Sequence, residues 1–358
     1  MSDRNQSLDA ARCVMNYMIV ILHAWAVFQY VKWDTIEFIS WTVICSHLMW
    51  LAIPAFFMIS GYLLFQKFSL ASWPNKMVRR VKRLAVPYFA WNIFFVAFYL
   101  ALAHFVPRLG TRVASFGLDT IGGAISKIAS LTVAPIDGPL WFLRVLFLFA
   151  LVSPILWWLM CFARGWALFG ATVVWCVVEG MLGIAEPLHL TAPAYALSCF
   201  VLGGVLARNE KDLVSTFKHW GWFAIGLAAC LIRAAISIPR LGVHSDTNAA
   251  ISIILSLLAI LEAPALISLV SHIRTEGVVK SRVYGFLKEM SFFAYAGHFL
   301  FCSMWLHTAA PLLSGMGGGK MTLLILIFVG CGIPTMALVY WLGKRICPRA
   351  MKIFDGTL

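Results

Sequence analysis

Arg12 and His23 lie in the first strongly apolar stretch of the chain, and their spacing places both side chains on one helix face. Eleven residues at about 100° each amount to three turns plus roughly 20°. At about 1.5 Å per residue they lie ~16 Å apart along the axis, roughly half the hydrocarbon thickness of a bilayer. Arg12 is therefore predicted near one membrane surface and His23 near the midplane. Ionisable groups at that depth are costly and usually mark a pathway or a reaction centre.

Other polar side chains are expected to extend this face. Asn16 is four residues after Arg12 and seven before His23, so all three line one stripe of the helix. Asp9, three residues before Arg12, is predicted to pair with it at the membrane surface. A later apolar stretch repeats the pattern with spacings of four and three, which place on one face Ser291, Tyr295 and His298.

Composition predicts an all-α polytopic membrane protein. The 358-residue chain is 61% hydrophobic and 12% charged, with a mean hydropathy of +0.87, whereas soluble domains carry about 25% charged residues. Its 15 Trp and 27 Phe suit lipid-facing walls and interfacial aromatic belts. The net charge of +13 is interpreted as basic cytoplasmic loops, and no nucleic-acid partner is expected. The nine Cys have no paired spacing, so neither a disulfide framework nor a metal site is predicted.

About ten segments have the length that a membrane crossing needs. Because no internal repeat or soluble domain is evident, residues 1–358 are predicted to form a single transmembrane domain. The first segment is too long for a cleavable signal peptide and is expected to remain as a helix. The predicted spans are Leu8–Tyr30, Val43–Phe65, Leu84–Phe105, Leu140–Met160, Trp166–Ile184, Ala192–Ala207, Trp220–Ile238, Asn248–Val270, Ser291–Ala310 and Met321–Gly343.

The distribution of Lys and Arg predicts that both termini are cytoplasmic. Of the 28 basic residues, 20 fall on the predicted inner side and six in outer connections, as the positive-inside rule requires. The inner side includes a basic loop at residues 66–83 and a tail at residues 344–358, and residues 106–139 form the longest outer loop, with room for a short interfacial helix. Four charges inside spans are expected to form structural ion pairs: Arg144, Glu179, Arg233 and Glu262.

Five motifs in order along the chain resemble those of the acyltransferase 3 family of membrane proteins. Two of them, R-x-x-R and W-F-L, are weak alone, but the set is hard to obtain by chance. The chain departs from the family at Cys13, where Gly is frequent, and at Pro139, where many members have His. The motifs are L-D-A-A-R at residues 8–12 with His23 completing Arg-x10-His, F-F-M-I-S-G-Y at 56–62, R-V-K-R at 80–83, P-L-W-F-L at 139–143 followed by S-P-I-L at 153–156, and S-F-F-A-Y-A-G-H at 291–298.

The resemblance implies transfer of an acyl group, usually acetyl, from cytoplasmic acyl-CoA to a hydroxyl of a cell-envelope glycan or a lipid-linked sugar. The expected partners are acetyl-CoA or another acyl-CoA as donor, the sugar acceptor and membrane lipid, with no metal. The protein is expected to be a multi-pass component of a cell inner or plasma membrane. No SGNH hydrolase-like domain, which some members carry, is expected after the last helix.

The resemblance also suggests roles for individual residues. Acyl transfer to an alcohol needs a base for the hydroxyl proton and a group that stabilises the developing oxyanion. His23 is expected to be the general base, or the acyl-activating residue if a covalent step occurs, because imidazole titrates near neutrality. Arg12 is expected to orient the donor or His23. Donor binding is assigned to Arg79, Arg80, Arg83 and Ser60, since guanidinium pairs bidentately with phosphate, and substrate contacts are assigned to Asn16, Trp141, Tyr295 and His298.

Each assignment has a structural alternative. His23 and His298 could be packing residues, and the basic segment 66–83 could serve topology alone. Gly61 is interpreted as helix packing through small residues, and Trp141 suits an interfacial aromatic. For the whole protein, the second hypothesis is a secondary transporter of a small solute, although repeated halves are not seen. A non-catalytic scaffold has no need for a His at this depth. The sequence leaves open the acceptor, the acyl length and the oligomeric state.

Overall fold

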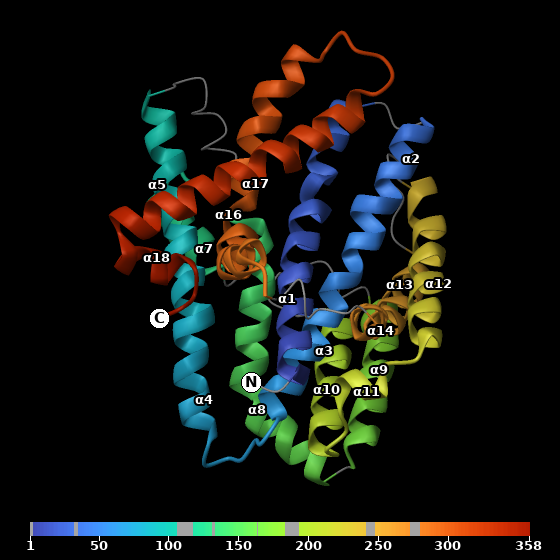
Figure 1. Cartoon of the computed structure of the whole chain (residues 1–358). Coiled ribbons are helices and arrows are strands. Elements are labelled where there is room, and N and C mark those ends of the chain that lie inside the picture. The colour runs from blue at the N-terminus through green and yellow to red at the C-terminus, as the bar shows by residue number, and fades with distance from the viewer. Residues whose placement is uncertain are drawn as a thin grey trace.

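The chain is described by a computed structural model over residues 3–31, 35–105, 117–130, 133–162, 164–182, 193–240, 248–272 and 280–358. Every regular element within these ranges is a helix (Figure 1), which confirms the all-α prediction. The α-helices are α1 (Asp3–Leu22), α2 (Ile36–Thr42), α3 (Ala52–Phe65), α4 (Trp73–Arg80), α5 (Val86–Phe105), α7 (Ile121–Ala129), α8 (Trp141–Phe162), α9 (Gly165–Leu182), α10 (Ala194–Arg208), α11 (Leu213–Thr216), α12 (Trp220–Ser237), α13 (Ala249–Glu262), α14 (Ala265–His272), α16 (Arg282–Leu312), α17 (Lys320–Ile346) and α18 (Pro348–Phe354).

Short segments of tighter or wider helix join or extend several of these elements. The 3₁₀ segments are η1 (His23–Tyr30), η3 (Met49–Leu51), η6 (Gly138–Leu140) and η7 (Ile238–Arg240), and the π-helical segments are η2 (Val43–Leu48) and η4 (Val81–Ala85). The first of them begins at His23, so the regular α-helix that carries Arg12 and Asn16 ends one residue before the imidazole. Irregular turns of this kind often occur at functional positions.

Eight helical stretches in the described residues are long and apolar enough to cross a membrane, which confirms a polytopic membrane protein. They coincide with eight of the ten predicted spans. The predicted span Ala192–Ala207 corresponds to α10, an apolar helix of 15 residues, and the predicted span Ser291–Ala310 lies inside the 31-residue α16. Hydropathy therefore located a helix at every predicted position. It missed the ends of α16, because a helix continues through polar residues that lower the mean hydropathy.

The basic segment predicted as a loop at residues 66–83 is largely helical. Helix α4 starts at Trp73 with Pro74 in its first turn, where the missing N–H of proline removes no helical hydrogen bond. It continues through η4 into α5 without a break. The charge pattern indicated a loop because Lys and Arg end the apolar run, whereas the backbone keeps its helical period. The arginines of this segment are consequently held on a helix rather than on a free loop.

The long connection before α8 packs into the bundle. Within its described residues it contains α7, which begins after a cap in which the Thr120 hydroxyl accepts a hydrogen bond from Gly123 N–H at 3.0 Å. A short helix was predicted here, and the structure contains one. Ile136 and Asp137, just before η6, are both buried. This connection therefore contributes side chains to the interior of the protein and does not merely cover its end.

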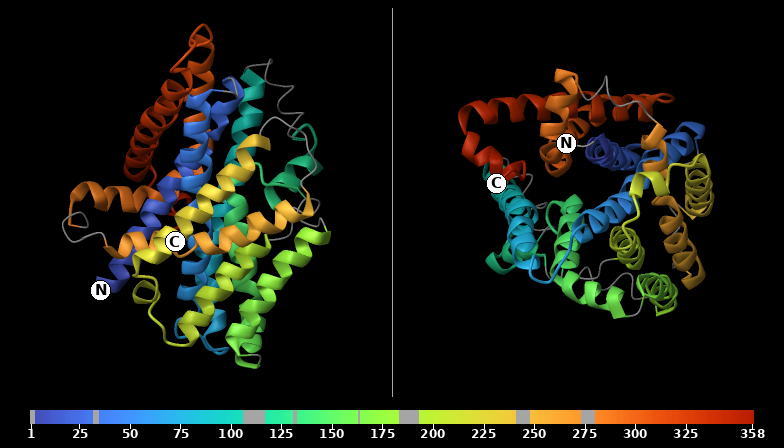
Figure 2. Two further views of the ribbon diagram at one scale, coloured as in Figure 1. Left: turned by 90° about the vertical axis from the view of Figure 1, so that its right-hand side faces the viewer. Right: turned by 60° about the horizontal axis from the view of Figure 1, so that its bottom comes forward.

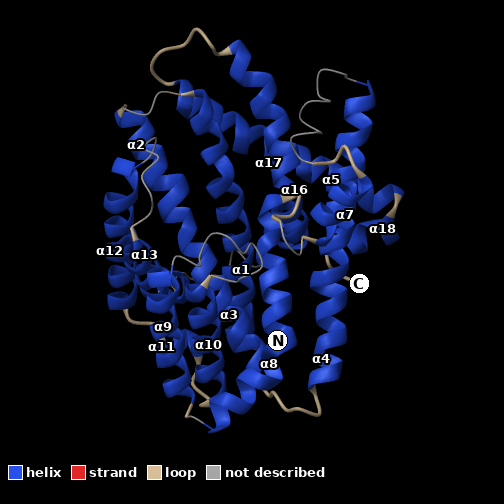
Figure 3. Ribbon diagram, turned by 180° about the vertical axis from the view of Figure 1, so that it is seen from behind, coloured by secondary structure: helices blue, strands red, loops and turns tan. Residues whose placement is uncertain are grey.

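The C-terminal helices α16 and α17 pack against the first helical segments of the chain, α1 and η1. Helix α17 packs on α16 and η1 and runs obliquely across them to reach α5, where α18 lies against the α5 backbone (Figure 1, Figure 2). Helices α9, α10, α12 and α13 form the opposite side of the bundle, as the view from behind shows (Figure 3). Helices α1, α3 and α8 lie between the two groups. Residues from both ends of the sequence are thereby brought to the same part of the structure.

Helices α3 and α10 form a close backbone contact. A Cβ added to Gly61 would lie 1.9 Å from the backbone oxygen of Phe200, and one added to Gly203 would lie 2.0 Å from that of Met58. A real Cβ cannot lie so close to another atom, so this backbone contact requires glycine at both positions. Small residues thus let the two helices approach closely. The interpretation of Gly61 as a packing residue is therefore confirmed.

The four charges inside the spans are all bonded, although only two pair with each other. Arg233 Nε donates to Glu262 Oε1 at 2.8 Å in a buried ion pair, as predicted. Glu179 instead accepts a hydrogen bond from the backbone N–H of Ala194, at the start of α10. Arg144 donates to the backbone and hydroxyl oxygens of Ser130. Backbone groups at helix ends thus replace the predicted partners, because those ends have unused hydrogen-bonding groups.

Gly203→Ala is expected to lower the free energy of unfolding by about 1–3 kcal/mol, the usual range for overpacking. The new methyl group forces the α3 and α10 backbones apart. Thermal unfolding in detergent micelles, followed by circular dichroism, measures the change. Gly330→Ala in α17 is the matched control, because its Cβ meets nothing within 4 Å. Equal unfolding temperatures for the two variants would contradict the close contact.

Candidate active site

A cavity of about 630 Å³ lies between α1, α3, α4, η4, α8 and α16. It is lined mainly from the ends of helices that the charge distribution predicts at the inner membrane surface, with further side chains from the start of α8. Seven of the ten residues predicted for the site line it: Arg12, Asn16, Ser60, Arg79, Arg80, Arg83 and Tyr295. The fold thus joins the basic segment at residues 79–83, the first helix and the polar face of α16 around one cavity.

The wall of this cavity is strongly cationic. Arg80 and Arg83 lie close enough to Arg12 for their charges to repel it. Among the described lining residues the acidic ones are Asp9 and Asp355, and both carboxylates are already bonded within the protein. Like charges gathered away from bulk water are unfavourable unless an anion or counter-ions join them. The cavity is therefore suited to a ligand with several negative charges.

Asp9 pairs with Lys288 of α16, and the predicted pair with Arg12 is not formed. The Lys288 Nζ lies 2.8 Å from Asp9 Oδ2. The predicted pair is based on spacing within one helix. Helix α16 packs on α1 and supplies the ammonium group of Lys288 instead. The Arg12 side chain is instead exposed to the cavity. This arrangement leaves the Arg12 charge available to a ligand.

His23 and His298 form a pair of imidazoles outside the cavity lining. Their ring centroids are 4.7 Å apart and their planes are inclined by 50°. Nδ1 of His23 lies 2.8 Å from the Ile19 carbonyl oxygen, and Nδ1 of His298 lies 2.5 Å from that of Tyr295. A carbonyl oxygen can only accept, so each Nδ1 carries a proton and each neutral ring keeps Nε2 as an acceptor. His23 is half-buried, whereas His298 is fully buried with Nε2 unpartnered among the described residues.

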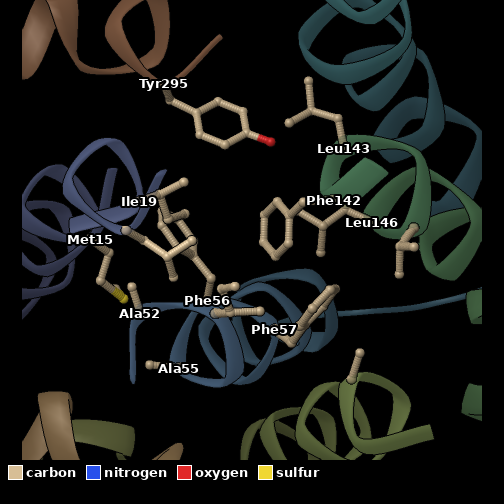
Figure 4. Packing of buried hydrophobic residues seen from close by; sticks show 14 of the residues in the cluster. Met15, Ile19, Ala52, Ala55, Phe56, Phe57, Phe142, Leu143, Leu146 and Tyr295 are labelled. Atoms are coloured by element: carbon tan, nitrogen blue, oxygen red, sulfur yellow. The ribbon is translucent and has the colours of Figure 1, made fainter. Parts of the chain in front are cut away.

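Aromatic side chains close the inner end of the cavity. The Phe142 ring centroid lies 5.5 Å from that of Phe56 and 6.5 Å from that of Tyr295. Figure 4 shows these three side chains and Ile19 converging from α3, α8, α16 and α1. Ile19 is four residues before His23, one helical turn along α1. The imidazole pair therefore lies one helical turn or less along α1 and α16 from side chains of this mostly apolar group, Ile19 and Tyr295.

Trp141 lies outside the cavity lining, as the two histidines do. It is half-buried and its ring packs against Phe57, with centroids 6.2 Å apart. The contact supports the junction of α8 with α3, and a role for Trp141 in substrate binding stays a prediction.

Two lysines in the lining were not predicted. Lys288 lies three residues before Ser291 and so continues the polar face of α16, a signal that was present in the sequence. Lys76 donates from Nζ to the backbone oxygens of Leu64 and Gln66, at 2.7 and 2.9 Å. Its position depends on how α4 folds back on the end of α3, which no local pattern encodes.

Asp137 is a buried acid that the sequence did not single out, because it falls in the predicted outer loop. It lies directly before the span that begins at Gly138 and is fully buried. Its backbone N–H donates to Asn92 Oδ1 at 3.3 Å, but neither carboxylate oxygen has a partner among the described residues. Burial raises the pKa of this carboxyl well above its ordinary value, so its neutral form is favoured.

Comparison with known proteins identifies the family of the chain. The acyltransferase 3 family, described as an acyltransferase domain, matches residues 5–344, nearly the whole chain. The chain belongs to the acyltransferase 3 family. No curated protein and no solved structure matches it. This acyltransferase 3 protein is thus a membrane acyltransferase. Within the described residues it has no group of three or more His, Cys, Asp or Glu side chains that could hold a metal ion.

Asp137→Asn is expected to stabilise this acyltransferase 3 protein at neutral pH. In the unfolded chain the carboxyl ionises near its ordinary pKa of about 3.9, whereas the folded protein keeps it neutral to higher pH. Stability is therefore lost as pH rises from about 4 towards the folded pKa, and Asn does not suffer this loss. The variant should match the wild type in stability near pH 4 and be more stable than the wild type at pH 7, with the difference growing as the pH rises.

The measurement is thermal unfolding in detergent across that pH range. Asp119→Asn, an exposed acid in the same connection, is the matched control and should show no such trend. A stability difference for Asp137→Asn that does not change with pH would show that the carboxyl is not held neutral.

Proposed function

We propose that this acyltransferase 3 protein is an O-acetyltransferase. It transfers the acetyl group of cytoplasmic acetyl-CoA, or another short acyl-CoA, to a hydroxyl of a cell-envelope glycan or lipid-linked sugar. The observation that carries the proposal is the grouping of Arg12, Arg80 and Arg83 around one cavity, with the His23–His298 pair beyond its inner end. Family membership supports the acyl transfer itself, and the resemblance that the sequence shows supports the sugar acceptor.

The cationic cavity would bind the nucleotide part of the donor. CoA carries several phosphate charges, and guanidinium groups pair with phosphate bidentately. Arg12 lies ~16 Å along α1 from His23, too far to contact a group that is reacting there. Its proximity to Arg80 and Arg83 therefore supports the donor-orienting role of Arg12 over a direct role in the chemistry.

The aromatic group at the inner end would contact the arm that carries the thioester. Phe56, Phe142 and Tyr295 line the cavity there and offer apolar contact area to such an arm. The charged nucleotide would stay in the cavity while the acyl group reaches the imidazoles. This division suits the chemistry, because acyl transfer away from bulk water avoids hydrolysis of the thioester.

His23 would act as the general base. Its Nδ1–H is held by the Ile19 carbonyl, which leaves the Nε2 lone pair for the acceptor hydroxyl. The hydroxyl oxygen attacks the thioester carbonyl carbon while its proton passes to Nε2. The tetrahedral intermediate then collapses with cleavage of the C–S bond. The CoA thiolate takes the proton from the imidazolium, so the products are the sugar ester and free CoA thiol.

His23→Ala is expected to lower kcat by about 10²- to 10⁴-fold, the usual contribution of a general base. The assay follows the release of CoA thiol from acetyl-CoA by purified protein in the presence of an envelope glycan fraction. His104→Ala, an exposed histidine at the end of α5, is the matched control and should retain activity. If His23→Ala and the wild type consume acetyl-CoA equally while both remain folded, His23 is not the base.

Arg80→Ala is expected to raise the KM for acetyl-CoA about ten- to a hundredfold with little change in kcat. A hydrogen bond to a charged group contributes ~1.5–3 kcal/mol, and each 1.4 kcal/mol is tenfold. Lys82→Ala is the control, because Lys82 lies on the same segment but is exposed outside the cavity lining. Equal increases of KM in both variants would indicate a general effect of charge and not a donor site.

A further inference from the structure

The residues that follow the family match complete the wall of the cavity. The match ends at residue 344, whereas Asp355, Gly356 and Thr357 all line the cavity beside the basic residues. They follow α18, which turns back beneath α17 towards α5 (Figure 1). From the sequence alone, residues 344–358 are predicted only as a cytoplasmic tail. In the structure, Asp355, Gly356 and Thr357 near the end of this segment line the cavity proposed to bind the donor.

Helix α18 is anchored firmly to α5. Trp91 Nε1 donates to the backbone oxygen of Phe354 at 3.0 Å, and the Phe354 ring makes edge contacts with Trp91 and Phe94 at 5.1 and 5.8 Å between centroids. Met351, one turn earlier, is buried beside Gly343 of α17. The residues that follow Phe354 therefore leave from a fixed point.

The last turn is also held in one conformation. Asp355 is 4% exposed, and its Oδ2 accepts a hydrogen bond from the Tyr340 hydroxyl at 3.2 Å. Its Oδ1 accepts from both the N–H and the hydroxyl of Thr357, at 3.0 and 2.6 Å. Gly356 between them has φ +70°, a left-handed conformation that costs glycine little. The carboxylate is thus used to fold the turn.

This turn lies against the donor-binding segment. A Cβ built on Gly356 would lie 3.4 Å from the backbone oxygen of Arg83 and 3.6 Å from the Phe292 ring. Arg83 belongs to the π-helical η4, whose wider turn is less regular than an α-helix. The turn therefore bounds the cavity and holds the backbone from which the Arg83 guanidinium projects.

We propose that Asp355, Gly356 and Thr357 form a donor-binding wall that positions Arg83 and raises affinity for the phosphate-bearing part of the acyl donor. This wall rests on the proposed function, because the ligand it serves is the proposed acyl-CoA. Gly356 and Thr357 act on donor binding and leave the acyl-transfer step unchanged. Asp355 and Tyr340 act as positioning residues that keep the turn against η4.

The test measures CoA binding and catalysis separately in the full-length protein in lipid nanodiscs. Gly356→Val strains the left-handed backbone and pushes against η4, and Thr357→Val removes the hydroxyl while keeping the side-chain size. We expect both to raise the Kd for CoA and the KM for acetyl-CoA about five- to tenfold, with kcat within about twofold of the wild type. Thr357→Ser restores the hydroxyl and should return both constants close to wild type.

Gly319→Val is the matched control. Gly319 also has a left-handed φ, of +77°, but a Cβ there meets nothing within 4 Å, and the residue lies at the start of α17, outside the cavity lining. This control separates backbone strain as such from strain applied to the cavity, and its Kd for CoA should equal that of the wild type.

Two failures are distinguishable. If the wild type binds no CoA by calorimetry, the donor assignment fails and the wall with it. If the wild type binds CoA but the Gly356 and Thr357 variants bind it equally well or more tightly, only the wall is overturned. A fall in kcat with unchanged Kd would also overturn it, because the residues would then act on chemistry and not on binding.

Discussion

The gathering of several cations around one cavity of a helix bundle is the constraint on which the structure depends. Like charges at close range repel one another, so each needs a partner, contact with solvent or an anion. The protein satisfies Lys76 with two carbonyl oxygens and Lys288 with Asp9. The arginines instead surround a cavity. Arg79, Arg80 and Arg83 lie on the continuous α4–η4–α5 helix, which keeps them together despite the repulsion, and their grouping suits an anionic ligand.

The proposed binding and catalytic groups are arranged in sequence along α1. Arg12 and Asn16 lie in the cavity wall, Ile19 lies in the apolar group at its inner end, and His23 lies one helical turn after Ile19. The proposed donor site and the proposed base therefore have different surroundings on one helix. The cavity carries the cationic side chains, whereas His298, which packs against His23, is fully buried. In the proposed mechanism, this separation lets the polyanionic part of the donor bind without placing its charge beside the base.

Two segments that hydropathy treats as peripheral supply buried polar groups. The connection before α8 contributes Asp137, whose carboxylate has no partner among the described residues, and the end of the chain contributes Asp355, whose carboxylate is fully used. Both acids are buried although they lie outside the apolar spans, because the segments that carry them pack into the bundle.

The sequence by itself determined the class of fold, the location of the helices and most of the cavity. Composition and apolar length decide membrane insertion locally, and spacing along one helix places Arg12, Asn16 and His23 on one face. The motifs pointed to Ser60, Arg80, Arg83 and Tyr295, and the fold brought all four to the cavity lining. Packing between helices far apart in the sequence decided the rest, including the Asp9–Lys288 pair, the contact of His23 with His298 and the position of Asp355. These depend on distances across the bundle, and no periodicity along one chain segment encodes such distances.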